Sequence, residues 1–369
     1  MQVFFRVDAS IDIGTGHVFR CLTLANFFKE KAKIHFICRD FEGNLSALIR
    51  EKGYLCHLLN GHLDESVSNL ERVEPVLTHS DWLKGSQYAD ALASLKVLAS
   101  CFARPGDCLF VDHFALSQNW EFLISDRVGM KIAVIDGQAD RPHHCHLLVD
   151  PTLCNSHDKW QGKLPSFSRL LQGFPYIPIH PKFFKLKIQI VPRHHLKQVL
   201  VAFGGIDQDD FTGIVLQELL NLSITYLSLV VVVGQHYPHL KSLRALAEQH
   251  GNVKVLCQID HIEDWMLSSD LAIGAGGTMA WERCMLGLPT LVAGIALNQH
   301  KQVGCLEELG VAIALGNNKK QVKNHLNSTV LNLYKNPERL VEMSLKAIEL
   351  TASASPGVWQ NILACLKGD

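Results

Sequence analysis

The chain has 369 residues and a formal net charge of −1, from 35 Lys and Arg against 36 Asp and Glu. Hydrophobic residues make up 47% and charged residues 19%, a globular composition that excludes a disordered or collagen-like chain. At about 150 residues per domain the length predicts two domains, and the balanced charge gives no reason to expect nucleic acid or a membrane surface as a partner.

The first half of the chain alternates short apolar runs with amphipathic stretches. We expect strands over 3–7, 33–38, 108–111 and 131–135, and helices over 16–32 and 88–102, where apolar residues recur at helical spacing. Strands that alternate with helices predict βαβ units and a mostly parallel sheet.

This alternation stops and then resumes in the second half. Residues 156–195 hold five prolines, Pro165, Pro175, Pro178, Pro181 and Pro192, and are expected to form an extended connector. Strands are then expected over 199–203, 227–233, 253–256, 271–273, 290–292 and 311–314, with a helix over 211–222. The sequence thus predicts an amino-terminal Rossmann-like domain over 1–155, the connector, and a carboxyl-terminal one over 196–369 with a helical tail. A ligand is expected between them, at carboxyl ends of strands.

The eleven cysteines are scattered, and no Cys-x-x-Cys pair occurs. This pattern predicts free thiols in a reducing compartment. Arg6 interrupts the apolar amino terminus, so we expect neither a signal peptide nor a spanning helix. The longest apolar run elsewhere, 227–233, is too short to cross a bilayer, and a soluble cytoplasmic protein is expected. Nothing in the sequence indicates an oligomeric state.

A glycine-rich loop follows the first expected strand, Asp12-Ile-Gly14-Thr-Gly16-His17, and opens the first expected helix. Glycines let the backbone approach a ligand, and the start of a helix offers free N–H groups. A third glycine at the spacing of a dinucleotide loop is missing. A neutral imidazole at this position is suited to accept a proton near pH 7, although His17 could equally cap or pack the helix.

A second glycine-rich loop, Gly274-Ala-Gly276-Gly277-Thr278, joins an expected strand to a helix, so its amides could hold a phosphate chain. Glu282, one turn later, would suit ribose hydroxyls, or it is simply an acid in the first turns of the helix. Gly204 and Gly205 end the strand that opens the second half, and Asn298-Gln299 follow another strand.

The remaining motifs give weaker indications of a functional site. His143, His144, His146 and Cys145 lack the spacing of a structural zinc site. Neither a P-loop nor a nucleophile elbow occurs. Asp112 and Asp136 each end an apolar strand, as ligand-binding acids or as satisfied loop acids. No metal and no cofactor is expected.

The string from Arg6-Val-Asp8 through Gly14-Thr-Gly16-His17 to Arg20 resembles the amino-terminal signature of the UDP-2,4-diacetamido-2,4,6-trideoxy-beta-L-altropyranose hydrolases of pseudaminic acid synthesis. Val111-Asp112-His113, Asp136 to Asp140-Arg141, Gly276 to Glu282 and Asn298-Gln299 are similar to further motifs of that family. The likeness covers most of residues 3–310. It implies the two-Rossmann-domain (GT-B) fold, shared with the glycosyltransferase that makes lipid II.

The resemblance also implies site residues. His17 would be the base that activates water for attack on the anomeric carbon, releasing UDP with inversion. The sugar would be held by the first domain and the motif after the second loop, through Arg6, Asp8, Gly14, Gly16, Arg20, Asp112, His113, Asp136, Asp140, Arg141, Asn298 and Gln299. UDP would be held by the second domain, through Gly204, Gly205, Asp207, Gly276, Gly277, Thr278 and Glu282.

The chain departs from the family pattern at Gly137, where a second Asp is usual, at Ile206, where Thr is usual, and at His180, where Arg is usual. Residues after Lys319-Lys320 match no motif. Three functions therefore stay open: a UDP-sugar hydrolase, a glycosyltransferase in which His17 deprotonates an acceptor hydroxyl, and an inactive nucleotide-sugar binding protein.

Overall fold

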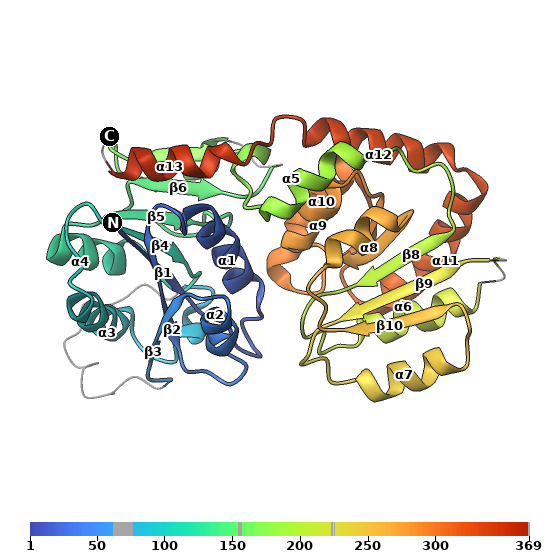
Figure 1. The fold of residues 1–369 in the computed structure, drawn as a ribbon, viewed down its shortest axis with the longest axis horizontal. Coiled ribbons are helices and arrows are strands. Elements are labelled where there is room, and N and C mark those ends of the chain that lie inside the picture. Colours follow the sequence, from blue (N-terminus) through green and yellow to red (C-terminus); the bar gives the residue numbers. More distant parts are fainter. Residues whose placement is uncertain (62–76, 154–156, 223, 225, 368–369) are drawn as a thin grey trace. The chain divides into compact units, whose positions relative to one another are not determined.

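The computed structural model describes residues 1–61, 77–153, 157–222, 224 and 226–367 (Figure 1). The chain divides into two compact units. One comprises Met1–Pro178 together with Ser355–Asp369, and the other comprises Ile179–Ala354. Each unit has its own parallel sheet and its own buried apolar core.

The first sheet has the strand order β3-β2-β1-β4-β5-β6-β7, with every pair parallel. Its strands are β1 (Gln2–Val7), β2 (Lys33–Arg39), β3 (Leu55–Leu59), β4 (Cys108–Asp112), β5 (Lys131–Ile135), β6 (Leu147–Asp150) and β7 (Arg169–Gln172). The unit's helices are α1 (Gly16–Phe28), α2 (Ser46–Glu51), α3 (Gln87–Ser100), α4 (Gln118–Val128) and α13 (Gly357–Lys367), with 3₁₀ turns over Ser80–Leu83, His157–Trp160 and Phe174–Tyr176.

Helices cover both faces of this sheet because successive strand residues point to opposite sides. On one face Phe4 and Ile37 pack with Leu98 of α3 and Trp120 of α4. On the other, Phe5 stacks near Phe28 of α1 at a ring distance of 6.4 Å. Because β1, β4 and β5 pair in parallel, their carboxyl ends meet at one edge of the sheet, beside the start of α1 (Figure 1).

The second sheet has the order β10-β9-β8-β11-β12-β13, again all parallel. Its strands are β8 (Gln198–Ala202), β9 (Ser228–Val233), β10 (Val253–Cys257), β11 (Leu271–Ala275), β12 (Thr290–Ala293) and β13 (Ala312–Gly316). The helices are α5 (Pro181–Leu186), α6 (Phe211–Leu220), α7 (Leu240–Glu248), α8 (Ile262–Ser268), α9 (Thr278–Met285), α10 (His300–Glu308), α11 (Lys319–Lys335) and α12 (Glu338–Leu350), with 3₁₀ turns over Lys187–Gln189 and Leu297–Gln299.

The expected connector and the expected tail differ from the sequence-based prediction, and β3 and β6 were not expected. The expected connector over 156–195 contains β7, which pairs with β6 and widens the first sheet, and also α5. The expected tail of the second domain returns to the first unit, because the buried side chains of α13, Trp359 and Leu363 among them, pack on that unit, where α13 lies against α1 (Figure 1). Residues 319–350, which match no motif, form α11 and α12 of the second unit.

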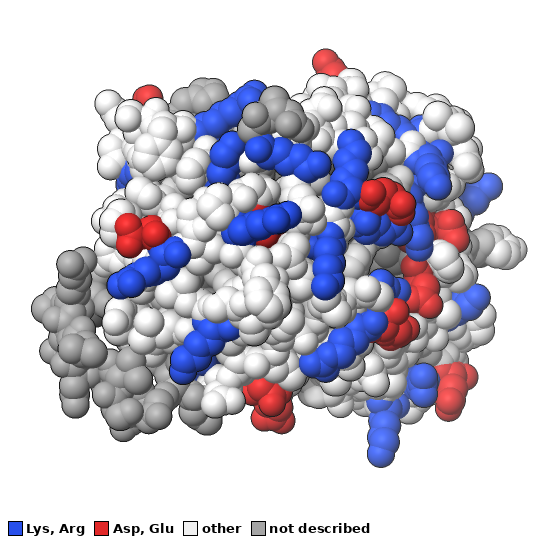
Figure 2. Space-filling view, turned by 60° about the vertical axis from the view of Figure 1, so that its left-hand side comes forward, with Lys and Arg blue, Asp and Glu red and all other residues white. Residues whose placement is uncertain are grey.

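The face drawn in Figure 2 carries many Lys and Arg side chains, with fewer Asp and Glu between them and uncharged areas around them. None of the helices in the described ranges is long and apolar enough to span a membrane. Nine cysteines are free thiols, as expected, whereas Cys305 is disulfide-bonded and Cys154 lies outside the described residues.

Candidate functional site

Buried carboxylates lie at or just after the carboxyl ends of four strands of the first sheet. Asp8, Asp112, Asp136 and Asp150 are each at most 1% exposed. Each is paired with a cation: Asp8 with Arg6, Asp112 with Arg20, Asp136 with Arg141 and Asp150 with Lys159. A buried carboxylate is stable only when it is paired and hydrogen-bonded, so the charge of this edge is neutralised from within the unit.

His17 lies at the start of α1 and is held by Asp112 of β4. Its Nδ1 is 2.6 Å from Oδ1 of Asp112, while Arg20, one turn along α1, donates to both carboxylate oxygens at 2.6 and 2.5 Å. Burial favours the neutral acid, but Arg20 and His17 hold the pKa of Asp112 at about 2. An ionised Asp112 fixes the proton of a neutral His17 on Nδ1, which leaves Nε2 as the basic nitrogen.

Aromatic rings enclose the His17 imidazole. Phe114 and Trp82 meet it edge-on at ring distances of 4.8 and 5.8 Å, and His79 packs on Trp82 at 4.5 Å. The His17 side chain is 9% exposed. No hydrogen bond to Nε2 occurs from any residue that the structure describes. Asp112 therefore fixes the orientation of the ring, and Nε2 has no hydrogen-bond partner among the described residues.

Arg6 and Asp8 belong to a network inside the unit. Arg6 donates to both oxygens of Asp8 at 2.6 and 2.9 Å and to both oxygens of Asp90 of α3 at 3.1 and 2.6 Å. Arg39 also donates to Asp90, at 3.0 and 2.7 Å. Burial opposes ionisation of Asp8, but Arg6 and His113 together keep its pKa below the ordinary range.

His113 connects this network to the edge of the sheet. Its Nε2 lies 3.0 Å from Oδ2 of Asp8, and its Nδ1 accepts from the Ala115 amide at 3.2 Å. Because Nδ1 accepts, the proton resides on Nε2 and the ring is neutral. Burial lowers the pKa of His113, consistent with that state. Arg6, Asp8 and His113 are thus all engaged inside the unit.

Asp136 and Arg141 belong to a second buried network. Arg141 lies 2.7 Å from Oδ2 of Asp136 and 2.8 Å from Asp140, and it donates to the Leu116 carbonyl at 2.6 Å. His143 lies 2.7 Å from Glu121 of α4 and 3.3 Å from Asp136. Burial opposes the charge on His143, but Glu121 and Asp136 raise its pKa to about 9. Asp140 alone in this group is partly exposed, at 31% of its side chain.

The first glycine loop is open, as its sequence predicts. Gly14 has φ +80° and bonds back to the Ser10 carbonyl at 2.8 Å, a turn that favours glycine. Nothing lies within 4 Å of where a Cβ at Gly14 or Gly16 would stand. The Thr15 side chain makes no capping bond to the amides in the first turn of α1.

The Gly137 departure has a steric reason. A Cβ at this position would stand 2.5 Å from Cγ2 of Thr152 and 3.4 Å from Oδ1 of Asp150. The Thr152 hydroxyl and amide both donate to Asp150, at 2.6 and 3.0 Å, which holds Thr152 in place. The space beside Gly137 is therefore already filled by the turn after β6.

The second glycine loop starts α9 without a side-chain cap. A Cβ at Gly276 would stand 2.6 Å from Val303 of α10, and one at Gly277 would stand 3.7 Å from Nε2 of Gln299. Gln299 thus lies beside the loop, as its sequence position suggests, and accepts from the Ile295 amide at 3.3 Å. Thr278 begins the helix. The side chain of Asn298 lies outside the described part of the chain.

The other residues expected to bind UDP differ in how far they are already engaged within the protein. Asp207 accepts from the amides of Phe211 and Thr212 at 3.0 and 2.7 Å, so its carboxylate caps the start of α6. Gly204 has φ +112° with open space at its Cβ position. Gly205 lies close to Gly234, because a Cβ added at Gly234 would stand 2.1 Å from the carbonyl oxygen of Gly205. Burial raises the pKa of Glu282 on α9 to about 7.

Several residues of the site have no motif in the sequence. His79, Trp82 and Phe114 surround His17, Asp90 joins the Arg6 network, and His143 with Glu121 supports Asp136. Their partners are distant in the chain, so spacing gives no signal. The cluster of His143, His144, Cys145 and His146 forms no metal group in the described residues, whereas His35, His57 and Cys101 do.

The sequence of this chain is similar to a known family model and to a curated protein. Residues 198–356 match the model of the glycosyltransferase family 28 C-terminal domain. A curated relative, the UDP-2,4-diacetamido-2,4,6-trideoxy-beta-L-altropyranose hydrolase of Campylobacter jejuni, is 24% identical over 286 residues, which are 78% of this chain and 89% of the relative.

Solved structures share the fold over the whole chain. MurG of Acinetobacter baumannii has a TM-score of 0.63 at 14% identity, and HepE of Anabaena, solved with UDP and glucose, has a TM-score of 0.58 at 12% identity. All of this chain and all of each neighbour are covered.

The fold of two parallel α/β units is therefore that of the GT-B glycosyltransferases, as expected. Within it, the second unit is similar to the carboxyl-terminal domain of glycosyltransferase family 28.

Proposed function

We propose that this protein is an enzyme that hydrolyses a UDP-activated 2,4-diacetamido-2,4,6-trideoxy hexose to UDP and the free sugar. The observation that carries the proposal is His17, oriented by Asp112 at 2.6 Å, with Nε2 unpartnered in the described structure beside an open glycine loop. The Campylobacter jejuni relative, whose name states this substrate, supports it over 78% of the chain. In pseudaminic acid synthesis this reaction would supply the free sugar.

In the proposed reaction, Nε2 of His17 accepts a proton from water as the water oxygen attacks the anomeric carbon. The bond from that carbon to the diphosphate oxygen breaks, its electron pair goes to the diphosphate, and UDP leaves from the opposite face, which inverts the anomeric centre. Asp112 and Arg20 position the imidazole, and Asp112 stabilises the imidazolium that forms.

The second unit is proposed to hold UDP. Diphosphate is a good leaving group, so its departure needs charge stabilisation more than a strong general acid. The amides at the start of α9, from Gly277 and Thr278, can supply that stabilisation, and Gly276 shapes the same loop. Glu282 is proposed to accept from the ribose hydroxyls, and Gly204 and Gly205 to border the nucleotide.

The remaining expected residues divide into two groups in this proposal. Asp140, Gly14 and Gly16 are open enough to meet the sugar, and Arg20, which is 12% exposed, is proposed to reach it from beside Asp112. Asn298 and Gln299 stay predicted sugar-binding residues. The buried residues act through their neighbours as positioning residues, since their polar atoms are engaged within the protein. These are Arg6, Asp8, Asp112, His113, Asp136, Arg141 and, in the second unit, Asp207.

The test is proton NMR of the protein with UDP-2,4-diacetamido-2,4,6-trideoxy-altrose and no added acceptor. We expect UDP and the inverted anomer to form first, and His17→Ala to slow release by about 10²- to 10⁴-fold, the usual contribution of a general base. His194→Ala, at an exposed position, serves as the matched control. Full activity of His17→Ala would refute His17 as the base.

A glycosyltransferase is the second candidate, because the second unit matches a glycosyltransferase family model and MurG shares the fold. In that case Nε2 of His17 would deprotonate an acceptor hydroxyl in place of water. Turnover that begins only when an acceptor is added would select this reaction. Calorimetric binding of UDP without turnover of any sugar nucleotide would instead select a binding protein.

A further inference from the structure

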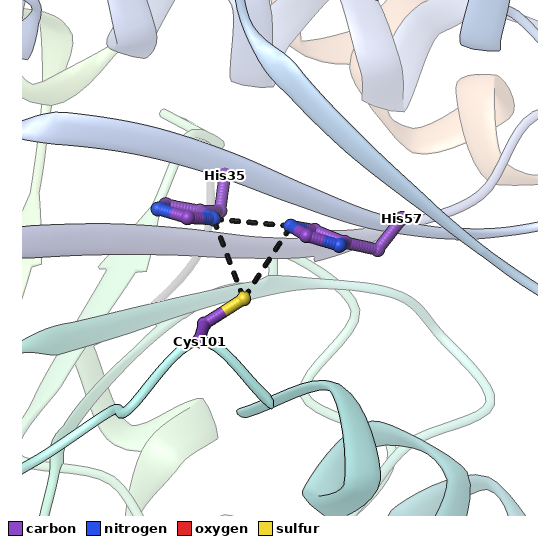
Figure 3. A group of neighbouring side chains, drawn as sticks. All are labelled: His35, His57 and Cys101. Atoms are coloured by element: carbon purple, nitrogen blue, oxygen red, sulfur yellow. Dashed lines mark hydrogen bonds between the residues drawn. The ribbon is translucent and has the colours of Figure 1, made fainter. Parts of the chain in front are cut away.

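Three side chains with metal-binding atoms meet in the first unit, away from the His17 loop: His35, His57 and Cys101 (Figure 3). Nδ1 of His35 is 3.0 Å from Nε2 of His57. Sγ of Cys101 is 3.7 Å from the first nitrogen and 3.6 Å from the second. One nitrogen of each imidazole and the sulfur thus form a small triangle, as the dashed lines in Figure 3 show.

The sheet and α3 bring these residues together. His35 of β2 pairs with Leu55 of β3, so His57, two residues further on, points to the same face. The two imidazoles lie parallel, with ring centres 5.3 Å apart and planes 7° apart, and Phe4 stacks on His35 at 4.6 Å. Cys101 ends α3, and its carbonyl accepts from the side chain of Gln2 at 3.1 Å.

The triangle has the dimensions of a metal site. Zinc binds histidine nitrogen at about 2.0–2.1 Å and cysteine sulfur at about 2.3 Å in a tetrahedron. A tetrahedron with these bonds separates two nitrogens by about 3.3 Å, and a nitrogen from a sulfur by about 3.6 Å. The observed separations of 3.0, 3.6 and 3.7 Å fit these edges within a few tenths of an ångström.

Without a metal, a hydrogen bond between the two imidazoles and one from the thiol can hold this triangle. In neutral imidazoles, a proton on Nδ1 of His35 can point to Nε2 of His57 or to the sulfur, and a thiol proton can serve one more contact. A cation at the centre would instead use a lone pair from each of the three atoms.

We propose that His35, His57 and Cys101 form a binding site for a zinc-class divalent cation, with Nδ1, Nε2 and a Cys101 thiolate as ligands and a fourth position for water. His35 is buried, whereas His57 and Cys101 are partly exposed and give the ion a route from solvent. The bound ion would tie the end of α3 to β2 and β3, and so stabilise this part of the first unit.

The test is titration of the reduced protein with Co²⁺, which reports thiolate ligation through a near-ultraviolet charge-transfer band. We expect one equivalent to bind, the band to appear, and Zn²⁺ to displace it. Cys101→Ser should lose the band, and both Cys101→Ser and His57→Gln should bind more than tenfold more weakly. Cys365→Ser, which removes an exposed thiol elsewhere in the same unit, is the matched control.

A second measurement guards against misfolded variants. Zn²⁺ should raise the thermal midpoint of the wild-type protein and of Cys365→Ser by several degrees, and a chelator should reverse the rise. Cys101→Ser should keep the metal-free midpoint of the wild type and show no response to Zn²⁺. A cobalt band that persists in Cys101→Ser, or that never forms in the wild type, would overturn the proposal and leave a metal-free thiol–imidazole cluster.

Discussion

At the scale of single residues, the candidate site depends on buried charges that are paired within the first unit. Asp112 fixes the orientation of the His17 imidazole through a hydrogen bond, and Arg20 stabilises the ionised form of Asp112. Arg6 and Asp8 resemble ligand-binding residues in the sequence, yet their groups bond to Asp90, Arg39 and to each other. Residue type and motif position identify such groups, but only packing decides whether they face a ligand or the interior.

Replacing Asp112 tests this orientation. Asp112→Asn removes the charge that stabilises a protonated His17 and can hold the wrong imidazole tautomer. We expect UDP release to fall by about 10²- to 10⁴-fold, while UDP affinity measured by calorimetry stays within about twofold, because we place UDP on the second unit. Asp126→Asn, at an exposed position of α4, is the control. An equal loss of UDP affinity would contradict an orienting role.

His143 makes the stability of the first unit depend on pH. Its folded pKa of about 9 lies above the ordinary 6.5, so its contribution is fully present below pH 6.5 and is lost as pH rises through 9. The difference corresponds to about 3 kcal/mol at most. Urea unfolding of the wild type should show this loss of stability between pH 6.5 and 9, and His143→Gln should remove it. The exposed control His194→Gln should keep the pH dependence of the wild type. If the unfolding free energy of His143→Gln also changed with pH as in the wild type, the assignment to His143 would be contradicted.

At the scale of elements, local sequence pattern predicts all six strands of the second sheet but misses β3, β6 and β7 of the first. β1, β4 and β5 are buried apolar runs that end in turn residues, and their expected and observed bounds agree within about one residue. β3 and β7 lie at the edges of the first sheet, where one side needs no partner and the sequence alternates less clearly. The strand pairing of β7 depends on β6, which no local signal reveals.

The turn after β5 gives a prediction at this scale. Gly137→Asp would restore the residue usual in the resembling family, but its Cβ would stand 2.5 Å from Cγ2 of Thr152. We expect the free energy of unfolding in urea to fall by about 1–3 kcal/mol, the usual cost of overpacking. Thr152→Ser removes that methyl and keeps the hydroxyl that donates to Asp150, so Gly137→Asp/Thr152→Ser should recover most of the loss. No recovery would show that backbone strain, not this contact, limits the position.

At the scale of the whole molecule, the chain makes two units but does not divide between them at one point. Ser355–Asp369 belongs with the first unit although it follows the second in sequence. Trp359 and Leu363 of α13 are each 1% exposed, and α13 lies against α1. Helix α13 is therefore part of the unit that holds the His17 loop.

Hydrogen exchange of a Trp359 variant tests this assignment. Trp359→Ala removes a fully buried aromatic side chain, which should destabilise the first unit by about 3–5 kcal/mol. Amides of β1–β6 should then exchange faster, while those of β8–β13 keep their protection. Trp265→Ala, which removes an aromatic contact with Lys254 in the second unit, should not affect β1–β6. Faster exchange confined to the second unit in Trp359→Ala would contradict the assignment of α13.

The sequence by itself determined the fold class, the two glycine loops and the position of His17. These rest on local properties: strand and helix periodicity, the conformations open to glycine, and the free amides at a helix start. Tertiary structure decided which charges are neutralised inside, through Asp90, Glu121 and His143, and that α13 closes the first unit. It also brought His35, His57 and Cys101 together. These contacts join residues far apart in the chain, and burial and pairing, which set their energies, exist only once the chain has folded.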